Sequence, residues 1–203
     1  MSRYPVPAQR RRGEEVIRRS RFVTTVAPAA SVQEAHDFIA EMRAEFSDAT
    51  HNCYAYVVGP PGTTLQVGMS DDGEPGGTAG RPMLAVLLGS GVGDIAAVVT
   101  RYFGGTKLGT GGLVRAYSGG VKQALVDLPT IEKITRVTVL VTGHYRWVTP
   151  VERLLPVFEA ETVGQEFTDR VAWQLAVPEE RAEELGRALT ELSHGELEVS
   201  IDE

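Results

Sequence analysis

The sequence of 203 residues contains only one cysteine, Cys53, so it cannot form an intrachain disulfide of the kind on which small secreted domains usually rely. No apolar run approaches the roughly 18 residues that a membrane-spanning helix needs. The first residues include three consecutive arginines followed by two glutamates, without the apolar core of a secretory signal. We therefore expect a cytoplasmic protein that makes no contact with a membrane.

The composition is that of an ordinary globular protein, with 42% hydrophobic and 23% charged residues. The net charge of -7 is uneven, because residues 1–133 carry 14 Lys and Arg against 13 Asp and Glu, whereas residues 134–203 carry 6 against 14. Glycine is also uneven, since 17 of the 22 glycines lie between positions 59 and 120. Both shifts predict two domains, at residues 14–130 and 134–203.

The first 21 residues form a basic segment, with seven arginines against two glutamates. We expect this proline-containing segment to fray before a first strand at 16–26. Two roles for it stay open. It is either a solvated tail or a contact with nucleic acid, because clustered arginines are the usual electrostatic mark of nucleic-acid binding.

Hydrophobic periodicity predicts an α+β fold for the first domain. Ser31 and Glu34 form a capping box, which predicts a helix whose apolar residues recur at steps of three and four. The other expected elements are strands at 16–26, 52–58, 65–69 and 95–102 and helices at about 78–88 and 112–128. The first domain is therefore expected to pack helices on a sheet.

The second domain shows a more regular pattern. The expected elements are strand 135–144, helix 149–158, strands 160–167 and 170–177, helix 178–192 and strand 196–201. This β-α-β-β-α-β order is that of the ferredoxin-like fold. An open sheet face in this fold can bind RNA, but we expect Val171, Trp173, Leu175 and Val177 to face the core.

Two glycine-rich segments each lead into an expected helix, and the second, residues 101–115, is the better candidate for binding phosphate. Glycine permits close backbone approach, and the free N–H groups at a helix start attract anions. The residues expected to hold a phosphate or RNA are Arg101, Gly104, Gly105, Lys107, Gly111, Gly112 and Arg115. A purely structural role for these glycines, as tight turns beside packed helices, is also open. Neither G-x-x-x-x-G-K-[ST] nor G-x-G-x-x-G is present, so nothing directly supports a kinase or nucleotidase.

The first glycine-rich segment, residues 70–81, carries three carboxylates, those of Asp71, Asp72 and Glu74. They could hold a hard divalent cation, whose ligands are usually oxygens. They could also pair with Arg81 or Arg101. We expect the arginine pairing, with no metal and no cofactor.

His51 and Cys53 lie two positions apart on an expected strand and would share one face of the sheet. A histidine and a cysteine can act as base and nucleophile. A lone cysteine at the start of a strand is more often a small buried residue, however. We therefore expect a structural role for Cys53 rather than a catalytic role for the pair.

Three blocks of sequence together carry a resemblance to a known family. They are HNCYAY at 51–56, SDDGEP to RP at 70–82, and VTRYFGG to RAYS at 99–118. The first domain, over roughly residues 14–128, resembles the IMPACT family, in particular its bacterial YigZ-type members. The resemblance implies that this domain has the fold of the second domain of a small-subunit ribosomal protein. It also implies a ferredoxin-like C-terminal domain similar to a domain of elongation factor G.

The resemblance implies a link to translational control, because eukaryotic relatives restrain an initiation-factor kinase through a protein partner. Bacteria lack that kinase, so the eukaryotic mechanism is not carried over. We expect a non-enzymatic, translation-associated regulator that binds RNA or a ribosome-associated component through residues 101–115 and the basic N-terminal segment. One alternative is a metal-assisted hydrolase or other enzyme acting on a phosphorylated or peptide substrate through Asp71, Asp72 and Glu74. Another is a protein-interaction module.

Overall fold

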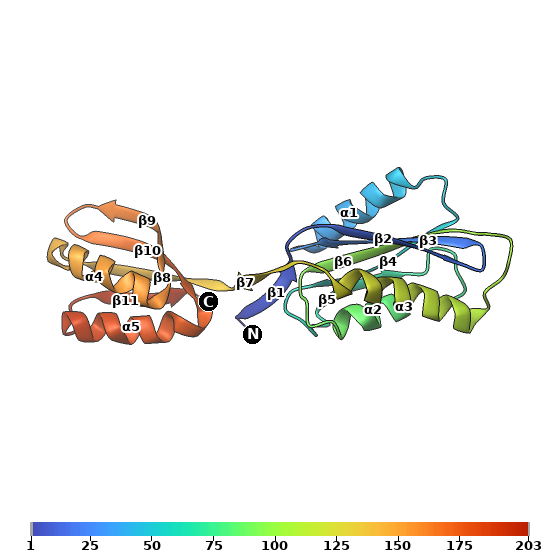
Figure 1. The fold of residues 1–203 in the computed structure, drawn as a ribbon. Coiled ribbons are helices and arrows are strands. Elements are labelled where there is room, and N and C mark those ends of the chain that lie inside the picture. Colours follow the sequence, from blue (N-terminus) through green and yellow to red (C-terminus); the bar gives the residue numbers. More distant parts are fainter. Residues whose placement is uncertain (1, 203) are drawn as a thin grey trace. The chain divides into compact units, whose positions relative to one another are not determined.

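The computed structural model describes residues 2–202, which form two compact units divided between Lys133 and Ile134 (Figure 1). Both units combine helices with a sheet, so the predicted α+β class is confirmed. The α-helices contain 7 to 17 residues. Within the described part of the chain, none is both long and apolar enough to cross a membrane.

The first domain, residues 3–133, is a sheet covered by helices on both faces (Figure 1). Its sheet strands are β2 (Arg11–Ile17), β3 (Ser20–Pro28), β4 (His51–Val58), β5 (Gln66–Ser70) and β6 (Ile95–Tyr102). Its helices are α1 (Val32–Glu45), α2 (Gly80–Leu88) and α3 (Thr110–Val126). The strands run antiparallel in the order β2-β3-β6-β4-β5. Helix α1 lies on one face, and α2 and α3 lie on the other.

The two faces of this sheet carry separate hydrophobic cores. Phe38 of α1 packs in one core, whereas Met83 of α2 and Tyr117 of α3 pack in the other. Because helices cover both faces, residues 95–101 of β6 are all buried. Five of its eight residues are therefore isoleucine, alanine or valine, with one buried cation, Arg101, near its end.

The first residues form ordered strands, so the expectation that they fray is wrong. Strand β2 pairs with β3 through a two-residue turn at Arg18 and Arg19, where the sequence predicted one strand at 16–26. Arg10 and Arg12 each donate two hydrogen bonds of 2.5 to 2.7 Å to a glutamate of α1. Three more arginines of this segment are also paired with acids, so five of its seven positive charges are neutralised within the domain.

Strands β1 (Arg3–Pro7) and β7 (Thr130–Ile134) pair with each other in a small separate sheet. The buried carboxylate of Asp94 holds them to the first domain. It accepts hydrogen bonds from the Tyr4 hydroxyl at 3.1 Å, the Lys133 ammonium at 2.5 Å and the Gly59 backbone N–H at 2.7 Å. The chain therefore leaves the first domain as a paired strand.

The second domain contains β8 (Arg136–Gly143), α4 (Val148–Leu154), β9 (Glu161–Phe167), β10 (Val171–Pro178), α5 (Glu179–Ser193) and β11 (Glu198–Asp202). The antiparallel order β11-β8-β10-β9 confirms the ferredoxin-like pattern. Val171, Trp173, Leu175 and Val177 are buried in its core, as predicted. The expected helix at 149–158 is instead α4 flanked by short 3-10 turns, at Tyr145–Trp147 and Leu155–Phe158. Pro156 has no N–H with which to continue the α-helix.

Candidate functional site

Asp71 holds the start of α2 in place. Its carboxylate accepts hydrogen bonds from the backbone N–H groups of Gly77, Ala79 and Gly80 at 2.7 to 2.9 Å. Burial opposes ionisation of this carboxyl, but the three N–H groups outweigh it and lower its pKa. Ala79, the residue preceding α2, has no side-chain cap to offer. Asp71 therefore supplies the missing cap from the preceding loop.

Asp72 is also fully engaged. One carboxylate oxygen accepts a hydrogen bond from the Arg43 guanidinium of α1 at 2.7 Å, and the other accepts from the Asn52 backbone N–H at 2.7 Å. The residue has a positive φ of 44°, a conformation that aspartate tolerates better than most residues. The partner of Asp72 is thus Arg43, which the sequence did not single out.

Glu74 points inward and pairs with Arg101, so the expected pairing of an arginine with this acidic segment is confirmed. The Oε1 atom of Glu74 lies 2.5 Å from Nη1 of Arg101 and accepts a hydrogen bond from the Tyr117 hydroxyl at 2.7 Å. The second Arg101 nitrogen, Nη2, donates to Ser20 Oγ at 3.2 Å. Arg81 is exposed and has no hydrogen-bond partner or acid partner among residues 2–202.

His51 and Cys53 of β4 support the acidic loop rather than forming a base and nucleophile pair. His51 Nδ1 donates to the Asp72 carbonyl oxygen at 2.8 Å, and the Cys53 thiol donates to the Asp71 carbonyl oxygen at 3.0 Å. Burial raises the pKa of the Cys53 thiol to about 12. A thiol held in this protonated form is a poor nucleophile.

The acidic segment therefore consists of a cap, a surface ion pair and a buried ion pair. Each of its three carboxylates has a separate set of partners. Across residues 2–202, no group of three or more His, Cys, Asp or Glu side chains is placed to hold a metal ion. This arrangement favours a structural role for the segment over acid–base or metal chemistry.

The second glycine-rich segment wraps around the start of α3. Arg101 lies at its buried beginning, and its side chain is only 5% exposed, so it is not a surface cation. Gly104 lies so close to the β2–β3 turn that an added Cβ would overlap the Arg19 carbonyl group. Gly105 has a positive φ of 81°, which favours glycine. The exposed Lys107 follows on the same loop.

Gly111 and Gly112 occupy the first turn of α3. A Cβ at Gly111 would meet open space, whereas one at Gly112 would press on the Leu108 side chain at 3.0 Å. The preceding residue, Gly109, offers no side-chain cap, so the first N–H groups of α3 lack one. Arg115 lies one turn further along the helix and is exposed.

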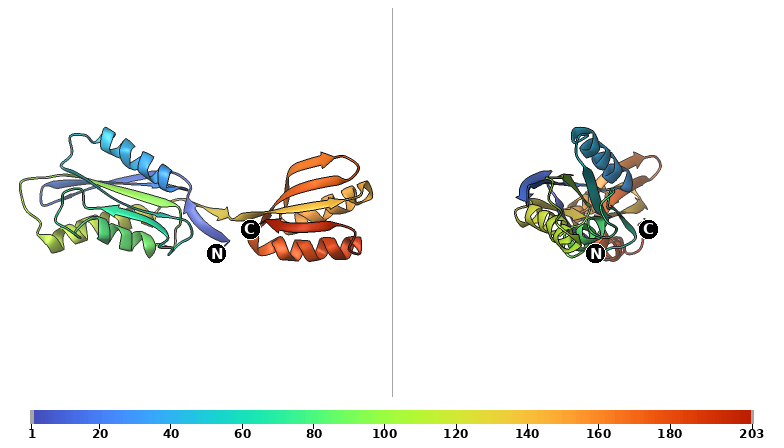
Figure 2. Two further views of the ribbon diagram at one scale, coloured as in Figure 1. Left: turned by 180° about the vertical axis from the view of Figure 1, so that it is seen from behind. Right: turned by 90° about the vertical axis from the view of Figure 1, so that its right-hand side faces the viewer.

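Arg18 and Arg19 belong to the basic N-terminal segment that was expected to contact RNA, but the sequence did not single them out from its other arginines; the structure places them in the β2–β3 turn. Arg18 and Arg115 line the same recess of about 330 Å³. Figures 1 and 2 show the β2–β3 turn and the β6–α3 loop at the same end of the first domain. We call Arg18, Arg19, Lys107 and Arg115 the basic end.

The basic end stands out because its cations are unpaired. None of the four has an acidic partner among residues 2–202. Eight of the ten other Lys and Arg residues of the first domain are paired with an acid. The basic end is therefore a local concentration of free positive charge.

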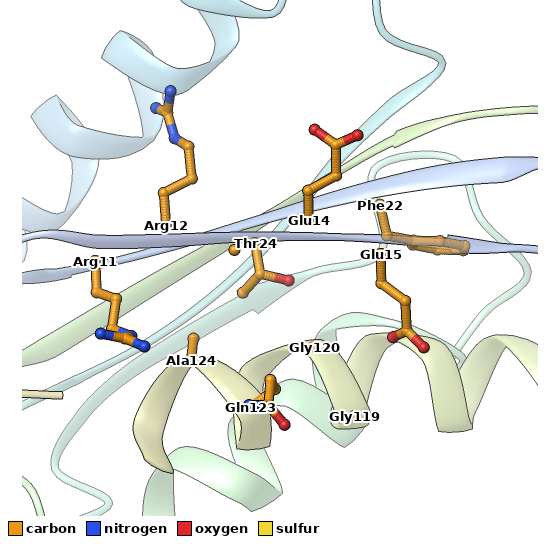
Figure 3. A pocket seen from close by; sticks show the side chains of 11 residues that line it. Arg11, Arg12, Glu14, Glu15, Phe22, Thr24, Gly119, Gly120, Gln123 and Ala124 are labelled. Carbon is orange, nitrogen blue, oxygen red and sulfur yellow. The ribbon is translucent and has the colours of Figure 1, made fainter. Parts of the chain in front are cut away.

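A second recess, of about 400 Å³, adjoins the basic end along the seam between β2 and α3. Figure 3 shows Arg11 and Glu15 pointing towards α3, whereas Arg12 and Glu14 point to the other face of the sheet. Both recesses share Glu15 and the glycine at position 119 as lining residues. Glu15 therefore adds one carboxylate beside the cations of the basic end, and the rest of the seam carries mixed charge.

The sequence contained little signal for the β2–β3 turn. A two-residue hairpin turn in which both residues have positive φ favours Asn-Gly, yet here Arg18 has a φ of 46° and Arg19 a φ of 68°. Arginine rarely adopts this conformation.

Known proteins match both domains in the order found here. The family model of the Impact N-terminal domain matches residues 18–125, and that of a domain of unknown function, DUF1949, matches residues 141–196. The IMPACT family member YigZ of Escherichia coli (strain K12) is 43% identical over 199 residues, which cover 98% of each chain. The IMPACT family member YvyE of Bacillus subtilis (strain 168) is 36% identical over 190 residues, covering 94% of this chain and 87% of that protein.

A solved crystal structure, described only as that of a hypothetical protein, shares this fold. It has 42% sequence identity and a TM-score of 0.76, and the match covers 100% of this chain and 98% of the other. Fold and site together define a two-domain α+β protein with an unpaired basic surface beside a helix start. The chain belongs to the IMPACT family.

Proposed function

We propose that the protein binds RNA through the basic end, as free RNA or as part of a ribosome-associated particle, in a cytoplasmic, translation-associated role. The observation that carries this proposal is that the four cations of the basic end are exposed and unpaired, and that Arg18 of the β2–β3 turn and Arg115 of α3 line the same recess. Surface arginines elsewhere in the domain are mostly neutralised by acids. Cations without internal partners are available to an external anion.

The local backbone also suits phosphate. RNA backbones are recognised by lysine, arginine and backbone N–H groups, and a helix start supplies such N–H groups. Gly111 has no side chain to block approach to the first turn of α3. Because the whole chain carries a charge of -7, attraction must be local and affinity modest.

The enzyme alternative is less well supported because its carboxylates already have internal partners. Asp71 caps a helix, Asp72 pairs with Arg43, and Glu74 is buried against Arg101. The Cys53 thiol is buried, so it packs in the core and is not accessible to a substrate. The translation-associated part of the proposal draws its support from what the family resemblance implies.

The test compares two double variants with equal loss of charge. Lys107→Ala/Arg115→Ala removes half of the basic end, whereas Arg81→Ala/Lys122→Ala removes two exposed, unpaired cations elsewhere in the same domain. Binding of a fluorescein-labelled RNA and of purified ribosomes is measured between about 50 and 200 mM salt. The first variant should bind more weakly, with a salt slope lower by roughly one per lost phosphate contact.

Both variants should unfold at nearly the same temperature as the parent, because neither pair of cations makes an internal ion pair. Equal losses in the two variants would indicate non-specific attraction and contradict the proposal. Equal affinity and equal salt slope in all three proteins would also contradict it. Binding only to a protein component, insensitive to salt, would favour the protein-interaction module.

A further inference from the structure

The basic end carries an exposed aromatic ring. Phe103 directly follows β6 and is 47% exposed, and it is the only exposed large aromatic residue of the first domain among residues 2–133. Its backbone N–H donates to Thr50 Oγ1 at 3.1 Å. Its ring centroid lies 5.4 Å from the Arg101 guanidinium carbon. A buried cation and a backbone hydrogen bond therefore hold this ring at the surface.

An aromatic side chain that stays exposed beside free cations has a specific chemical use. Bases of unpaired nucleotides stack on such rings, and positive side chains around them bind the phosphates. The bases of a duplex are already stacked on one another and cannot reach a surface ring. The ring thus distinguishes two forms of the same ligand that charge alone would not distinguish.

Building on the proposed RNA binding, we propose that the basic end selects single-stranded RNA. Phe103 stacks on one unpaired base, and Arg18, Arg19, Lys107 and Arg115 bind the flanking phosphates. Phe103 and Lys107 come from the β6–α3 loop, Arg115 from α3, and the two arginines from the β2–β3 turn. Three elements that are separate in sequence therefore contribute to one site.

The turn and the loop are fixed relative to each other. The Gly104 backbone N–H donates to Ser20 Oγ at 3.3 Å, and the same hydroxyl accepts from Arg101 at 3.2 Å. Gly104 also packs directly on the backbone of Arg19. The backbone that carries the two arginines is thus held beside the loop that carries Phe103 before any ligand binds, which reduces the ordering cost of binding.

The first experiment replaces the ring. Phe103→Leu keeps an apolar side chain but removes the stacking surface, and Phe167→Leu makes the same change at an exposed phenylalanine of the second domain. Each protein is titrated with a single-stranded RNA and with an RNA duplex of equal length. Phe103→Leu should weaken single-strand binding roughly 5- to 100-fold and leave duplex binding unchanged. Phe167→Leu should change neither.

A fluorescent base analogue in the single strand tests stacking directly. An oligonucleotide containing 2-aminopurine should lose fluorescence on the parent protein and on Phe167→Leu, but not on Phe103→Leu at saturating protein. Equal quenching by all three proteins would overturn the role of Phe103. Binding of the duplex by the parent at least as tightly as of the single strand would overturn the selection for single strands.

A second variant uses the strained turn. Arg18→Asn/Arg19→Gly installs the residues that a turn with two positive φ values favours. This variant should unfold at a higher temperature than the parent and still bind single-stranded RNA more weakly, with a lower salt slope. A more stable protein with unchanged binding would overturn the role of the turn, because loss of folding could not explain the result.

The outcomes separate this inference from the proposed function. If Lys107→Ala/Arg115→Ala weakens RNA binding while Phe103→Leu and the turn variant do not, RNA binding stands and single-strand selection fails. If none of these variants affects RNA binding, both fail. Tight binding of an acidic peptide with no binding of single-stranded RNA would assign the cations to a protein partner and also overturn both.

Discussion

Glu74 and Arg101 form an ion pair of 2.5 Å in which neither side chain is more than 5% exposed. Tyr117 adds a hydrogen bond to the same glutamate oxygen, and Phe22 and Phe103 each lie 5.4 Å from the guanidinium carbon. The pair therefore joins the acidic segment to the surface ring of the basic end. Loss of this ion pair should therefore disturb both the acidic segment and the position of the Phe103 ring.

Replacing Glu74 by leucine should destabilise the first domain strongly. The substitution leaves the Arg101 charge buried and unpaired, which typically costs about 3 to 5 kcal/mol. The measurement is the free energy of unfolding in urea. Glu14→Ala, which breaks the exposed pair with Arg21, should change it little. Similar changes in the free energy of unfolding for the two substitutions would show that the buried pair contributes no more to stability than the exposed pair.

The Cys53 thiol should be unreactive in the folded protein. Because burial raises its pKa to about 12, almost no thiolate is present at neutral or mildly alkaline pH. A thiol-specific reagent should therefore label the native protein far more slowly than the urea-unfolded protein. Labelling of the native protein at the rate of a free cysteine would contradict this and would restore interest in Cys53 as a nucleophile.

Asp71 should make the first domain sensitive to acid. Its pKa is lowered in the folded state from an ordinary value of 3.8, because three N–H hydrogen bonds outweigh the opposing effect of burial. A group of this kind stabilises the fold above its unfolded pKa, and this contribution is lost as the pH falls through the folded pKa.

Asp71→Asn retains one oxygen acceptor and removes the charge, so it should be less stable at neutral pH by about 1 to 2 kcal/mol. Below about pH 4 the difference from the parent should shrink. Urea unfolding across this range measures both effects. A difference that does not change with pH would mean that the charge of Asp71 contributes nothing.

The adjacent glycines of α3 should respond in opposite directions to alanine. A Cβ at Gly119 would have nothing within 4 Å, so Gly119→Ala should stabilise the helix by up to about 1 kcal/mol. A Cβ at Gly120 would overlap Thr24 Oγ1, so Gly120→Ala should destabilise the domain. Urea unfolding of the two variants is the measurement, and stabilisation by both would contradict the close packing of α3 on β3.

Local signals in the sequence were sufficient for many elements. Ser31 Oγ accepts the Glu34 N–H at 3.1 Å, and the Glu34 carboxylate accepts the Ala30 N–H at 2.8 Å, so the capping box began α1 as predicted. The alternation of apolar residues identified the ferredoxin-like core. Such features depend on neighbours within a few residues, which is why they can be predicted from sequence.

The features that the sequence did not predict depend on contacts between distant residues. Asp72 and Arg43 lie 29 positions apart in the sequence, so no local sequence pattern predicts that they pair. Arg101 is buried because helices cover both faces of the sheet, whereas its charge alone suggested a surface cation. At Arg18 and Arg19 the backbone adopts a conformation that their side chains disfavour, so propensity pointed away from the turn.

The contact between Gly104 and the backbone of Arg19 has a consequence for how this end of the molecule can change. The distance between the arginines of the turn and Lys107 of the loop is set where two main chains touch. An alanine at position 104 would push the two main chains apart and alter the spacing at which successive anions can be held, although it changes no charge. The glycine at position 104 therefore helps to set the spacing of the cations that would contact a bound anion.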